Sequence, residues 1–271
     1  MTYQDTINYL YTAAPLFQQK GAAAYKPGLH TTHLLDEHFG YPHRKFKSIH
    51  IAGTNGKGST AHTIAAILQS AGYKVGLYTS PHLVDFRERI RINGEMVSEQ
   101  YVIDFVENER NFFEPLSPSF FELTTALAFK YIAEKQVDVA IIEVGLGGRL
   151  DCTNIITPLL SIITNISLDH TQFLGHSLKE IASEKAGIIK ANVPVVIGEY
   201  TDETKAVFFE KASLEDSPIF FAEDNMEVLH AEVLPNGFRR YTTKSFGVLD
   251  SELSADYQVA NANTILTAIR I

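Results

Sequence analysis

Residues 47–60 of the chain read KSIHIAGTNGKGST. The apolar run at 47–53 is short and ends in glycine, and from Lys57 onward apolar residues recur at helical spacing as far as Gly72. A strand, a glycine-rich loop and a helix in this order can hold phosphate oxygens, because backbone N–H groups and the helix N-terminus point at the same place. We therefore predict a phosphate loop at 52–60, in which Lys57 meets the β- and γ-phosphates.

This loop departs from the strict pattern GxxxxGK[ST]. The first glycine of that pattern would fall on Ile51, Gly58 follows Lys57 directly, and Ser59 comes one place later. The alternative is a glycine-rich turn without a ligand. Three glycines, a lysine and two hydroxyl side chains exceed what such a turn requires, so the phosphate-binding interpretation is favoured.

The rest of the chain alternates strand and helix patterns. Near-continuous apolar runs are typical of strands buried on both faces of a parallel sheet, and two helices are opened by capping boxes, Ser119 with Glu122 and Ser177 with Glu180. The pattern predicts an α/β fold, a mostly parallel doubly wound sheet flanked by helices, with a small antiparallel appendage at about 218–250. The expected strands are 47–53, 75–79, 137–144, 159–166 and 193–197, and the expected helices are 57–72, 98–113, 119–135 and 177–189.

Composition narrows the class of protein. The chain has 271 residues, and its single cysteine, Cys152, allows no intramolecular disulfide or cysteine-based metal cluster, which favours the cytoplasm. Its 32 acidic residues outnumber 23 Lys and Arg, so we expect no nucleic-acid partner. No apolar run approaches the roughly 18 residues of a membrane helix, so no membrane association is expected.

Side chains that could bind a metal ion or take part in catalysis lie at the ends of two predicted strands. Glu143 closes the run VDVAIIEV just before the glycine-rich GLGGRLD, and Asp169 and His170 follow the next apolar run. In a parallel sheet both would project at the carboxyl edge where ligands collect, so Glu143 is a candidate magnesium ligand. The alternatives stay open: Glu143 could pair with Arg149 or cap a helix, and His170 could be a structural hydrogen-bonding residue.

Other titratable residues carry weaker signals. Six histidines fall between positions 30 and 62, but no cysteine or HExxH pattern accompanies them, so we predict no metal site there. By default Lys185 and Lys190, in SEKAGIIK, are ordinary helix-surface charges. The six histidines between positions 30 and 62 are His30, His33, His38, His43, His50 and His62.

Taken together, these stretches resemble the folylpolyglutamate synthase and dihydrofolate synthase family, a branch of the Mur-type ATP-dependent amide ligases. The resemblance runs from about residue 25 to the end, with the motifs in the family's order. The matching stretches are IHIAGTNGKGST (49–60), YTSPHLVDFRERIRING (78–94), EVGLGGRLDCTN (143–154), SLDHTQFLGHSLKEIASEKAGIIK (167–190) and the closing DYQVANANTILTA (256–268).

The resemblance implies a reaction in which ATP phosphorylates a folate or dihydropteroate carboxylate and L-glutamate attacks the acyl phosphate to form an amide. It implies ATP and Mg²⁺ as cofactors, with Ser59 and Glu143 holding a first magnesium ion. Ser80, Glu143 and His170 would hold a second one, placed with the help of a carbamylated Lys185. The residues implied in ATP binding are Thr54, Asn55, Gly56, Lys57, Gly58, Ser59, Thr60 and Asn261, the last against the adenine, and those implied in catalysis are Lys57, Lys185 and His170.

For the pterin substrate, the resemblance implies aromatic stacking on Phe121 and a polar anchor at Asp151. The loop after Ser80, with His82 and Arg89, would gate the substrate. Cys152 stands where the family often has alanine, a change that a small side chain tolerates.

For the domain organisation, we expect residues 1–271 to form one ATP-binding domain with a helical lead-in at 1–45, and we expect the family's C-terminal ligase domain to be absent. On that expectation the isolated domain is a monomer that does not ligate glutamate. Two alternatives remain open at this stage: another Mur-type ligase, and a module that binds nucleotide or pterin without ligase activity.

Overall fold

The computed structural model describes residues 1–13 and 28–271. Its strands form an eight-stranded sheet in the order β4-β3-β2-β5-β1-β6-β7-β8 and a three-stranded sheet in the order β11-β10-β9. The chain divides into two compact units, residues 1–49 with 65–157, and residues 50–64 with 158–271. The predicted α/β fold with a small antiparallel sheet is confirmed, and the prediction of one ATP-binding domain stays a prediction.

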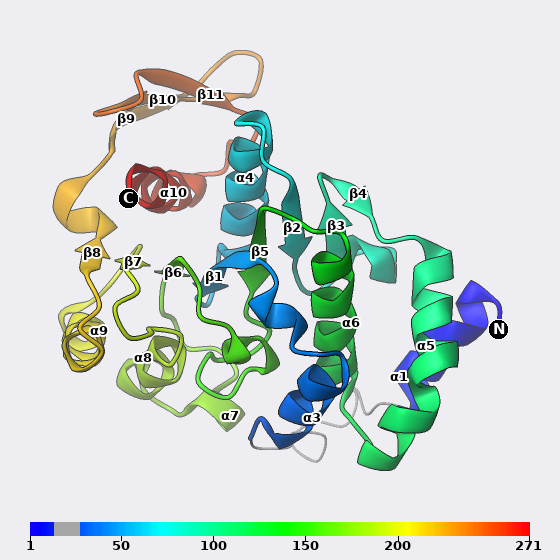
Figure 1. Ribbon diagram of the computed structural model, residues 1–271. Helices are drawn as coiled ribbons and strands as arrows, with labels where there is room; N and C mark the ends of the chain where they lie inside the picture. The colour runs from blue at the N-terminus through cyan, green and yellow to red at the C-terminus, as the bar shows by residue number, and fades with distance from the viewer. Residues whose placement is uncertain (14–27) are drawn as a thin grey trace. The chain divides into compact units, whose positions relative to one another are not determined.

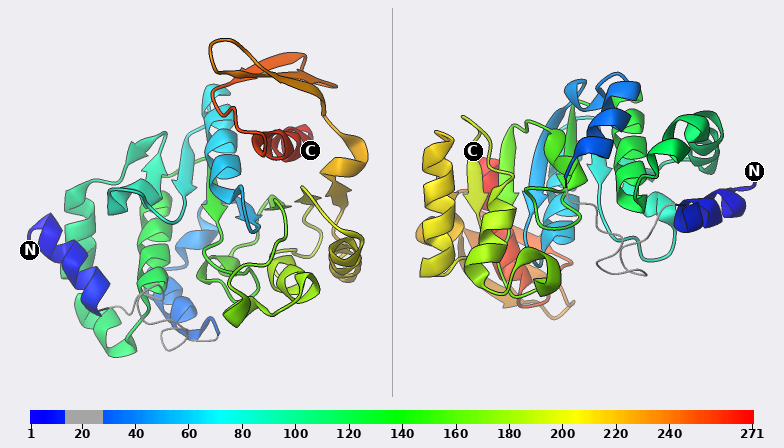
Figure 2. Two further views of the ribbon diagram at one scale, coloured as in Figure 1. Left: turned by 180° about the vertical axis from the view of Figure 1, so that it is seen from behind. Right: turned by 90° about the horizontal axis from the view of Figure 1, so that it is seen from below.

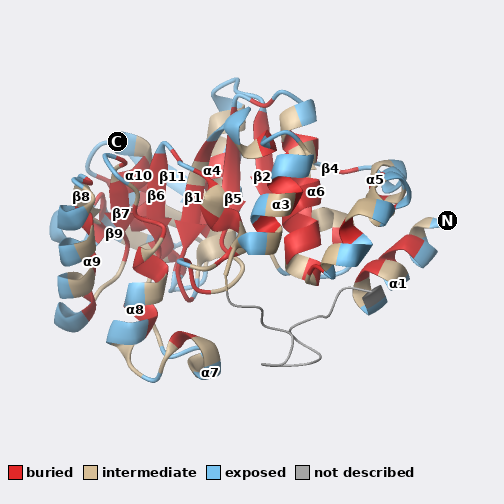
Figure 3. Cartoon of the chain, turned by 60° about the horizontal axis from the view of Figure 1, so that its bottom comes forward, coloured by how far each residue is buried: buried red, intermediate tan, exposed pale blue. Residues whose placement is uncertain are grey.

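The first unit is built on parallel pairing between two of the predicted strands. Strand β2 (Val75–Tyr78) runs parallel to β5 (Val139–Glu143), with Val75 opposite Val139 and Tyr78 opposite Ile142. Every residue of both strands is buried, as the apolar runs predict (Figure 3). The other elements of this unit are η3 (Phe86–Arg89), α5 (Glu99–Phe113), η4 (Glu114–Leu116), α6 (Phe120–Glu134) and η5 (Cys152–Ile155).

A short antiparallel hairpin at the end of this sheet was not predicted. Strand β3 (Ile90–Ile92) pairs with β2 on one side and with β4 (Glu95–Met96) on the other. Asn93 and Gly94 both have positive φ, 49° and 81°, which is the requirement of a two-residue type I′ turn. The sheet is therefore mixed rather than wholly parallel.

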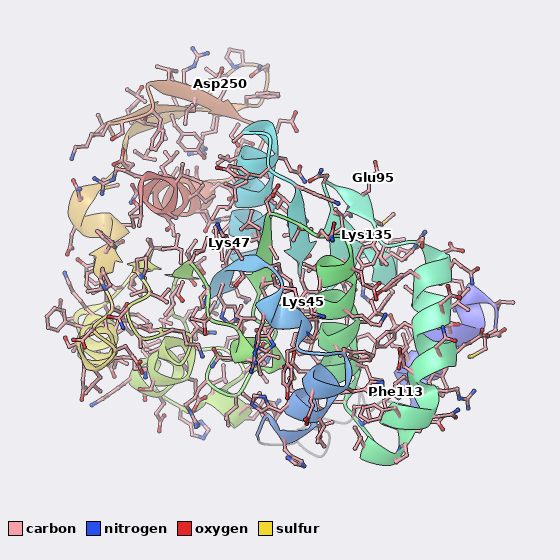
Figure 4. The ribbon with its side chains drawn as sticks, in the orientation of Figure 1. Lys45, Lys47, Glu95, Phe113, Lys135 and Asp250 are labelled. Carbon is pink, nitrogen blue, oxygen red and sulfur yellow. The ribbon has the colours of Figure 1, made fainter. Side chains whose placement is uncertain are left out.

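The helical lead-in predicted at 1–45 contains α1 (Tyr3–Ala13), α3 (His30–His38) and η2 (Pro42–Arg44), while residues 14–27 lie outside the described part. Helix α1 lies beside α5 (Figures 1 and 2). Phe113 is labelled in Figure 4 at the end of α5, and the centre of its ring is 6.4 Å from that of Tyr9 on α1. Three tyrosines on α1 make hydrogen bonds to other elements of this unit, Tyr3 with Asp85, Tyr9 with Glu114 and Tyr11 with His82.

The second unit contains parallel strands that follow the phosphate loop in the sequence. Strand β6 (Leu160–Ile163) pairs with β7 (Val195–Ile197), and β7 pairs with β8 (Ile219–Phe221). The predicted appendage at 218–250 therefore starts too early, because 219–221 belongs to the large sheet; a three-residue strand is too short to show a period. The other elements here are α7 (Thr171–Leu174), α8 (Leu178–Ala186), α9 (Asp202–Leu214) and η6 (Ala222–Asn225).

Strand β1 (Lys47–Ala52) and helix α4 (Lys57–Ser70) frame the phosphate loop and are each divided between the units. Both predicted capping boxes are confirmed. Ser119 caps α6 with Glu122, and Ser177 caps α8 with Glu180, each pair satisfying two backbone N–H groups.

The appendage itself is an antiparallel sheet that lies over helix α10 (Figures 1 and 2). Val228 and Tyr241 from the sheet pack with Leu266 from the helix. Asp250, labelled in Figure 4, pairs with Arg240 on the neighbouring strand. The bounds are β9 (Val228–Val233), β10 (Arg239–Thr243), β11 (Val248–Ser251) and α10 (Gln258–Arg270). Within residues 1–13 and 28–271, no helix has both the length and the apolar character needed to cross a membrane.

Candidate functional site

In the second unit, the phosphate loop is held by the segment that follows β6. The backbone N–H of Thr54 donates to the carbonyl oxygen of Asn165 at 3.0 Å, and the backbone N–H of Asn55 donates to the Asn165 side chain at 2.9 Å. The Thr54 hydroxyl accepts from the N–H of Ser167, and the Thr164 hydroxyl donates to the carbonyl oxygen of Asn55 at 2.6 Å. The predicted loop is therefore held in place by hydrogen bonds to residues 164–167.

Two glycines allow this close packing. Gly53 has a φ of 145°, and a β-carbon there would lie 1.8 Å from Oγ1 of Thr164. Gly56 has a φ of 81°, and a β-carbon there would lie 2.2 Å from Oδ1 of Asn261. Side chains are excluded at both positions by backbone conformation and by space, so only glycine lets the loop backbone pack this closely against Thr164 and Asn261.

Lys57 and Lys185 meet at one backbone oxygen. The Lys57 ammonium donates to the carbonyl oxygens of Gly53 and Thr54 at 3.0 Å each, and the Lys185 ammonium donates to Gly53 at 2.9 Å. The default expectation that Lys185 is a surface charge is wrong, because the residue is only 4% exposed. Lys185 is four positions after the buried Ile181, so the helical period places it on the inner face of α8.

Helix α10 reaches the start of α4 through two amide side chains. Gln258 Nε2 donates to the hydroxyl of Ser59 at 3.3 Å, and Asn261 Nδ2 donates to Gln258 Oε1 at 2.9 Å. Sequence reasoning named Ser59 and Asn261 but missed Gln258, which lies in the same closing motif. The three side chains form one hydrogen-bonded row beside the loop.

The remaining predicted loop residues lie in the first turn of α4 or just before it. The Thr60 hydroxyl is enclosed and has no hydrogen-bond partner among the described residues. The Gly58 carbonyl oxygen is 2.9 Å from Nδ1 of His62, and the Asn55 side chain donates to the Ser167 hydroxyl. The first turn of a helix leaves N–H groups without intrahelical acceptors, which is where phosphate oxygens bind.

His170 lies farther from the sheet than the sequence predicts. The expected strand at 159–166 ends at Ile163, so His170 stands in the following loop as the residue before α7. It is exposed, its backbone is left-handed with a φ of 47°, and its N–H donates to Asp169 at 2.8 Å. Its predicted role in metal binding stays a prediction.

In the first unit, Glu143 ends strand β5 as predicted. Its side chain is 3% exposed, and one carboxylate oxygen accepts the backbone N–H of Ser80 at 3.2 Å. Two of the predicted magnesium ligands are thereby adjacent in this unit, while Ser59 and His170 belong to the other. The described ranges 1–13 and 28–271 contain no group of three or more His, Cys, Asp or Glu side chains placed to hold a metal ion.

Asp151 holds the glycine-rich loop after β5. Its carboxylate accepts the backbone N–H groups of Leu146 and Thr153 and the Thr153 hydroxyl, and it caps η5. Burial raises the pKa of this carboxyl above its ordinary value, and the hydrogen bonds oppose that shift. In this structure the carboxylate organises the loop, and its predicted role as a pterin anchor stays a prediction.

Phe121 lies against the same loop. A β-carbon at Gly145 would lie 2.3 Å from the Phe121 ring, so the glycine lets the backbone pass over the aromatic face. The centre of the Phe121 ring is 6.0 Å from that of Tyr78, and the two planes are 28° apart. Tyr78 is fully buried and Phe121 is half-buried, and the predicted stacking of Phe121 on a pterin stays a prediction.

The loop at 80–89 contains the two remaining predicted residues. Arg89 Nε donates to His82 Nδ1 at 2.7 Å, and His82 Nε2 is 3.0 Å from the hydroxyl of Tyr11. Glu88 fixes the loop between them by accepting the backbone N–H groups of Leu83, Val84 and Asp85. Sequence reasoning missed Tyr11, because no local pattern links residues 71 positions apart.

The fold and the loop define a class of protein, the nucleotide-binding α/β domains with a phosphate loop between a strand and a helix. Residues 51–268 match the family model of the Mur ligase middle domain. The chain is 42% identical over 219 residues to the dihydrofolate synthase/folylpolyglutamate synthase of Bacillus subtilis, covering 78% of this chain and 51% of that protein. It is 38% identical over 272 residues to the folylpolyglutamate synthase of Lacticaseibacillus casei, covering 96% of this chain and 62% of that protein.

A solved FPGS-AMPPCP-folate complex has the same fold, with a TM-score of 0.90 at 36% identity over 100% of this chain and 67% of the other. The chain therefore belongs to the Mur ligase family, in its folylpolyglutamate synthase and dihydrofolate synthase branch. The resemblance seen in the sequence is confirmed at the level of the family. The chain spans about half to three fifths of the length of these two relatives.

Proposed function

We propose that this chain supplies the ATP-binding part of a ligase that adds L-glutamate to the carboxylate of a folate or dihydropteroate substrate through an acyl phosphate. One observation carries the proposal: Lys57 and Lys185 both donate to the carbonyl oxygen of Gly53 at the N-terminus of α4. The relatives named for this reaction, and the complex that contains AMPPCP and folate, support the choice of substrates.

Two lysine cations lie close together beside the loop before any modification of Lys185. Because both ammonium groups lie within hydrogen-bond distance of one oxygen, they are at most about 6 Å apart, and at an effective dielectric of 20 their repulsion is about 3 kcal/mol. This repulsion favours conversion of one of the two cations to an anion, which leaves Lys57 to bind the triphosphate. The open N–H groups of the first helical turn add further donors to the phosphate oxygens.

The donor set fits magnesium. Ser59, Ser80 and Glu143 offer oxygen atoms, which Mg²⁺ prefers, and we propose Ser59 with Glu143 for a first ion and Ser80, Glu143 and His170 for a second. When bound, magnesium neutralises charge on the phosphate oxygens during phosphoryl transfer. The hydrogen bond from Gln258 fixes the Ser59 hydroxyl for this task.

Lys185 is proposed to carry a carbamate. The neutral Nζ amine adds to the carbon of CO₂, a nitrogen–carbon bond forms, and one proton is released to solvent, so that a cation becomes an anionic oxygen ligand. The change also removes the repulsion between Lys185 and Lys57. Protein incubated with ¹³C-bicarbonate should show a carbamate NMR signal that disappears in Lys185→Arg and persists in Lys190→Arg; a signal unchanged in Lys185→Arg contradicts the assignment.

The chain's own residues orient the first chemical step. A substrate carboxylate oxygen forms a bond to the γ-phosphorus as the bond to ADP breaks, and Lys57 stabilises the phosphate charge. In the second step the glutamate amine attacks the acyl carbon, phosphate leaves, and the amine loses a proton. A carboxylate is a poor electrophile, so conversion to an anhydride is what makes the amide bond accessible.

The remaining predicted residues complete the proposal. Asn261 contacts the adenine, Phe121 stacks on the pterin ring and Asp151 anchors it, and the loop with His82 and Arg89 gates its entry. We further propose a monomer that works in the cytoplasm and does not bind nucleic acid, supported by the single cysteine and the net charge of −9.

The test uses the gene product that contains residues 1–271. With MgATP, L-glutamate and folate or dihydropteroate, ADP release should equal formation of the γ-glutamyl or glutamyl amide product. Stimulation by peptidoglycan precursors instead would identify another Mur-type ligase, and tight nucleotide binding with no product from either substrate would identify a binding module. Either result would refute the proposed function.

A further inference from the structure

Arg89 is a buried cation with an unusual set of partners. Its side chain is 7% exposed, and among the described residues no carboxylate lies within ion-pair distance of it. Burial lowers its pKa, and the charge of Glu143, acting from farther away, opposes that shift. Its hydrogen bond within the described ranges is the one from Nε to Nδ1 of His82. Buried arginines are normally paired with an acid, because removing an unpaired charge from water is costly.

Three side chains fix the plane of this guanidinium. The Arg89 Cζ atom lies 5.3 Å from the centre of the Phe120 ring, and His82 accepts from Nε. Tyr11 holds His82 from the other side and stacks on Phe120, with ring centres 5.2 Å apart. A guanidinium held in this way needs little further ordering to bind a ligand.

The chemistry of the contact fixes the state of the imidazole. An arginine N–H only donates, so His82 Nδ1 is the acceptor, and the proton of the neutral ring is on Nε2 facing the Tyr11 hydroxyl. Burial, and then the charge of Arg89, lower the pKa of His82, which favours this neutral form. Nearby Glu88 and Asp85 oppose the shift without reversing it.

The bond to His82 also decides which edge of the guanidinium remains. A guanidinium can bind a planar acid through Nε with one terminal nitrogen, or through its two terminal nitrogens. His82 occupies Nε, which leaves the two terminal nitrogens. Neither terminal nitrogen has a hydrogen-bond partner in the described part of the chain, and neither is fully enclosed. The small exposed fraction of Arg89 therefore includes these two nitrogens.

We propose that Arg89 is the receptor for a carboxylate of the pterin-type acceptor, bound through its two terminal nitrogens, with Tyr11 and His82 as positioning residues. This inference rests on the proposed function and names the group that this loop recognises. A planar carboxylate matches the paired terminal nitrogens, and the aromatic rings of Phe120, Phe86 and Tyr11 suit an acid attached to an aromatic ring. Phosphate is assigned to the other unit, where the phosphate loop lies.

The test compares ligands that differ in one charge. Pteroate, pteroate methyl ester, folate, L-glutamate and MgATP are titrated by calorimetry into wild type and Arg89→Gln. We expect Arg89→Gln to weaken pteroate 10- to 100-fold, to weaken folate less because its carboxylates are not attached to an aromatic ring, to leave MgATP within twofold, and to bind the ester no more weakly than wild type does. The matched control is Arg87→Gln, an adjacent arginine paired with Asp85, which should leave pteroate binding within twofold.

A milder variant protects the test against misfolding. Tyr11→Phe keeps the ring on Phe120 and removes only the hydroxyl that holds His82, so pteroate should weaken three- to tenfold with MgATP unchanged. Tyr9→Phe on the same helix removes a hydroxyl bonded to Glu114 and should have no effect. In both pairs, melting temperature reports folding separately from binding.

The outcomes separate the two proposals. Equal affinity of wild type for pteroate and its methyl ester, or a loss confined to L-glutamate or MgATP in Arg89→Gln, overturns the carboxylate assignment and leaves the proposed function standing. Equal effects of Tyr11→Phe and Tyr9→Phe overturn the positioning role. Absence of any pteroate or folate binding by wild type that binds MgATP refutes the proposed function and this inference together.

Discussion

Replacing Gly53 by alanine tests whether the phosphate loop is shaped by its contact with Thr164. The backbone conformation at Gly53, with a φ of 145°, is one that side chains disfavour, at a cost of about 1–3 kcal/mol. The new β-carbon would also lie 1.8 Å from Thr164 Oγ1 and 3.1 Å from the Thr164 backbone nitrogen. Overpacking of this kind costs about 1–3 kcal/mol.

Thr164 cannot yield without further loss. Its hydroxyl donates to the carbonyl oxygen of Asn55, and its backbone N–H donates to Ala52, so displacing it sacrifices a hydrogen bond of about 1 kcal/mol. We expect Gly53→Ala to lower the free energy of unfolding by about 3–7 kcal/mol. MgATP affinity should fall more than tenfold, because the Gly53 carbonyl oxygen orients Lys57 and Lys185.

Gly72→Ala is the matched control. Gly72 also has a positive φ, 92°, but a β-carbon there meets nothing within 4 Å, so it carries the conformational cost alone, about 1–3 kcal/mol. Urea unfolding of both variants and calorimetry with MgATP measure the difference. Equal losses of stability in the two variants would show that the contact with Thr164 does not shape the loop, and the reasoning would be wrong.

Three further predictions use other parts of the chain. Lys57→Ala should abolish measurable MgATP binding, and it should lower the melting temperature by no more than about 2–4 °C, which corresponds to about 1 kcal/mol of stability. The reason is that this lysine contacts loop carbonyls and not the core. Calorimetry and a thermal melt measure the two effects. Burial, and then Lys190, lower the pKa of His50 to about 3, so stability that is full above pH 6.5 is lost as pH falls toward 3. Wild type should lose about 2 kcal/mol more than His50→Gln between pH 6.5 and 5 in urea unfolding, and equal slopes would contradict the burial of a neutral ring. Asn263→Ala should destabilise the protein by about 2–4 kcal/mol in the same assay, because the buried side chain bonds the backbone of Glu227, Val228 and Ala222; a loss below 0.5 kcal/mol would contradict it.

Local chemistry explains which parts of the fold were predictable. The capping boxes at Ser119 and Ser177, and the loop at 52–60, are specified by neighbours three or four residues apart, so the sequence alone reveals them. Buried parallel strands such as β5 are recognisable in the sequence because their residues form continuous apolar runs. The family was also predictable, because five motifs occur in order.

Elements without a local period were not predictable. The three-residue β8 is too short, and its pairing depends on β7, which is distant in sequence. The hairpin of β3 and β4 did leave a local signal that was overlooked, the Asn93-Gly94 pair of its type I′ turn. The burial of Lys185 could have been predicted from its position four residues after Ile181, on the same face of α8. It was missed because a charged side chain is normally expected at the surface. The contacts of Tyr11 with His82 and of Gln258 with Ser59 join distant segments, so only the folded chain reveals them.

Helix α10 gives the small antiparallel sheet a role at a distance. Gln258 and Asn261 contact Ser59 and the Gly56 position, while Asn263 holds the start of β9 and Arg270 pairs with Glu227. A helix is stiff along its axis, so a displacement of the sheet that moves Asn263 also moves the two amides at the phosphate loop. A substitution on β9, β10 or β11 that shifts α10 would therefore move Gln258 and Asn261 beside the phosphate loop while every residue of the loop stays unchanged.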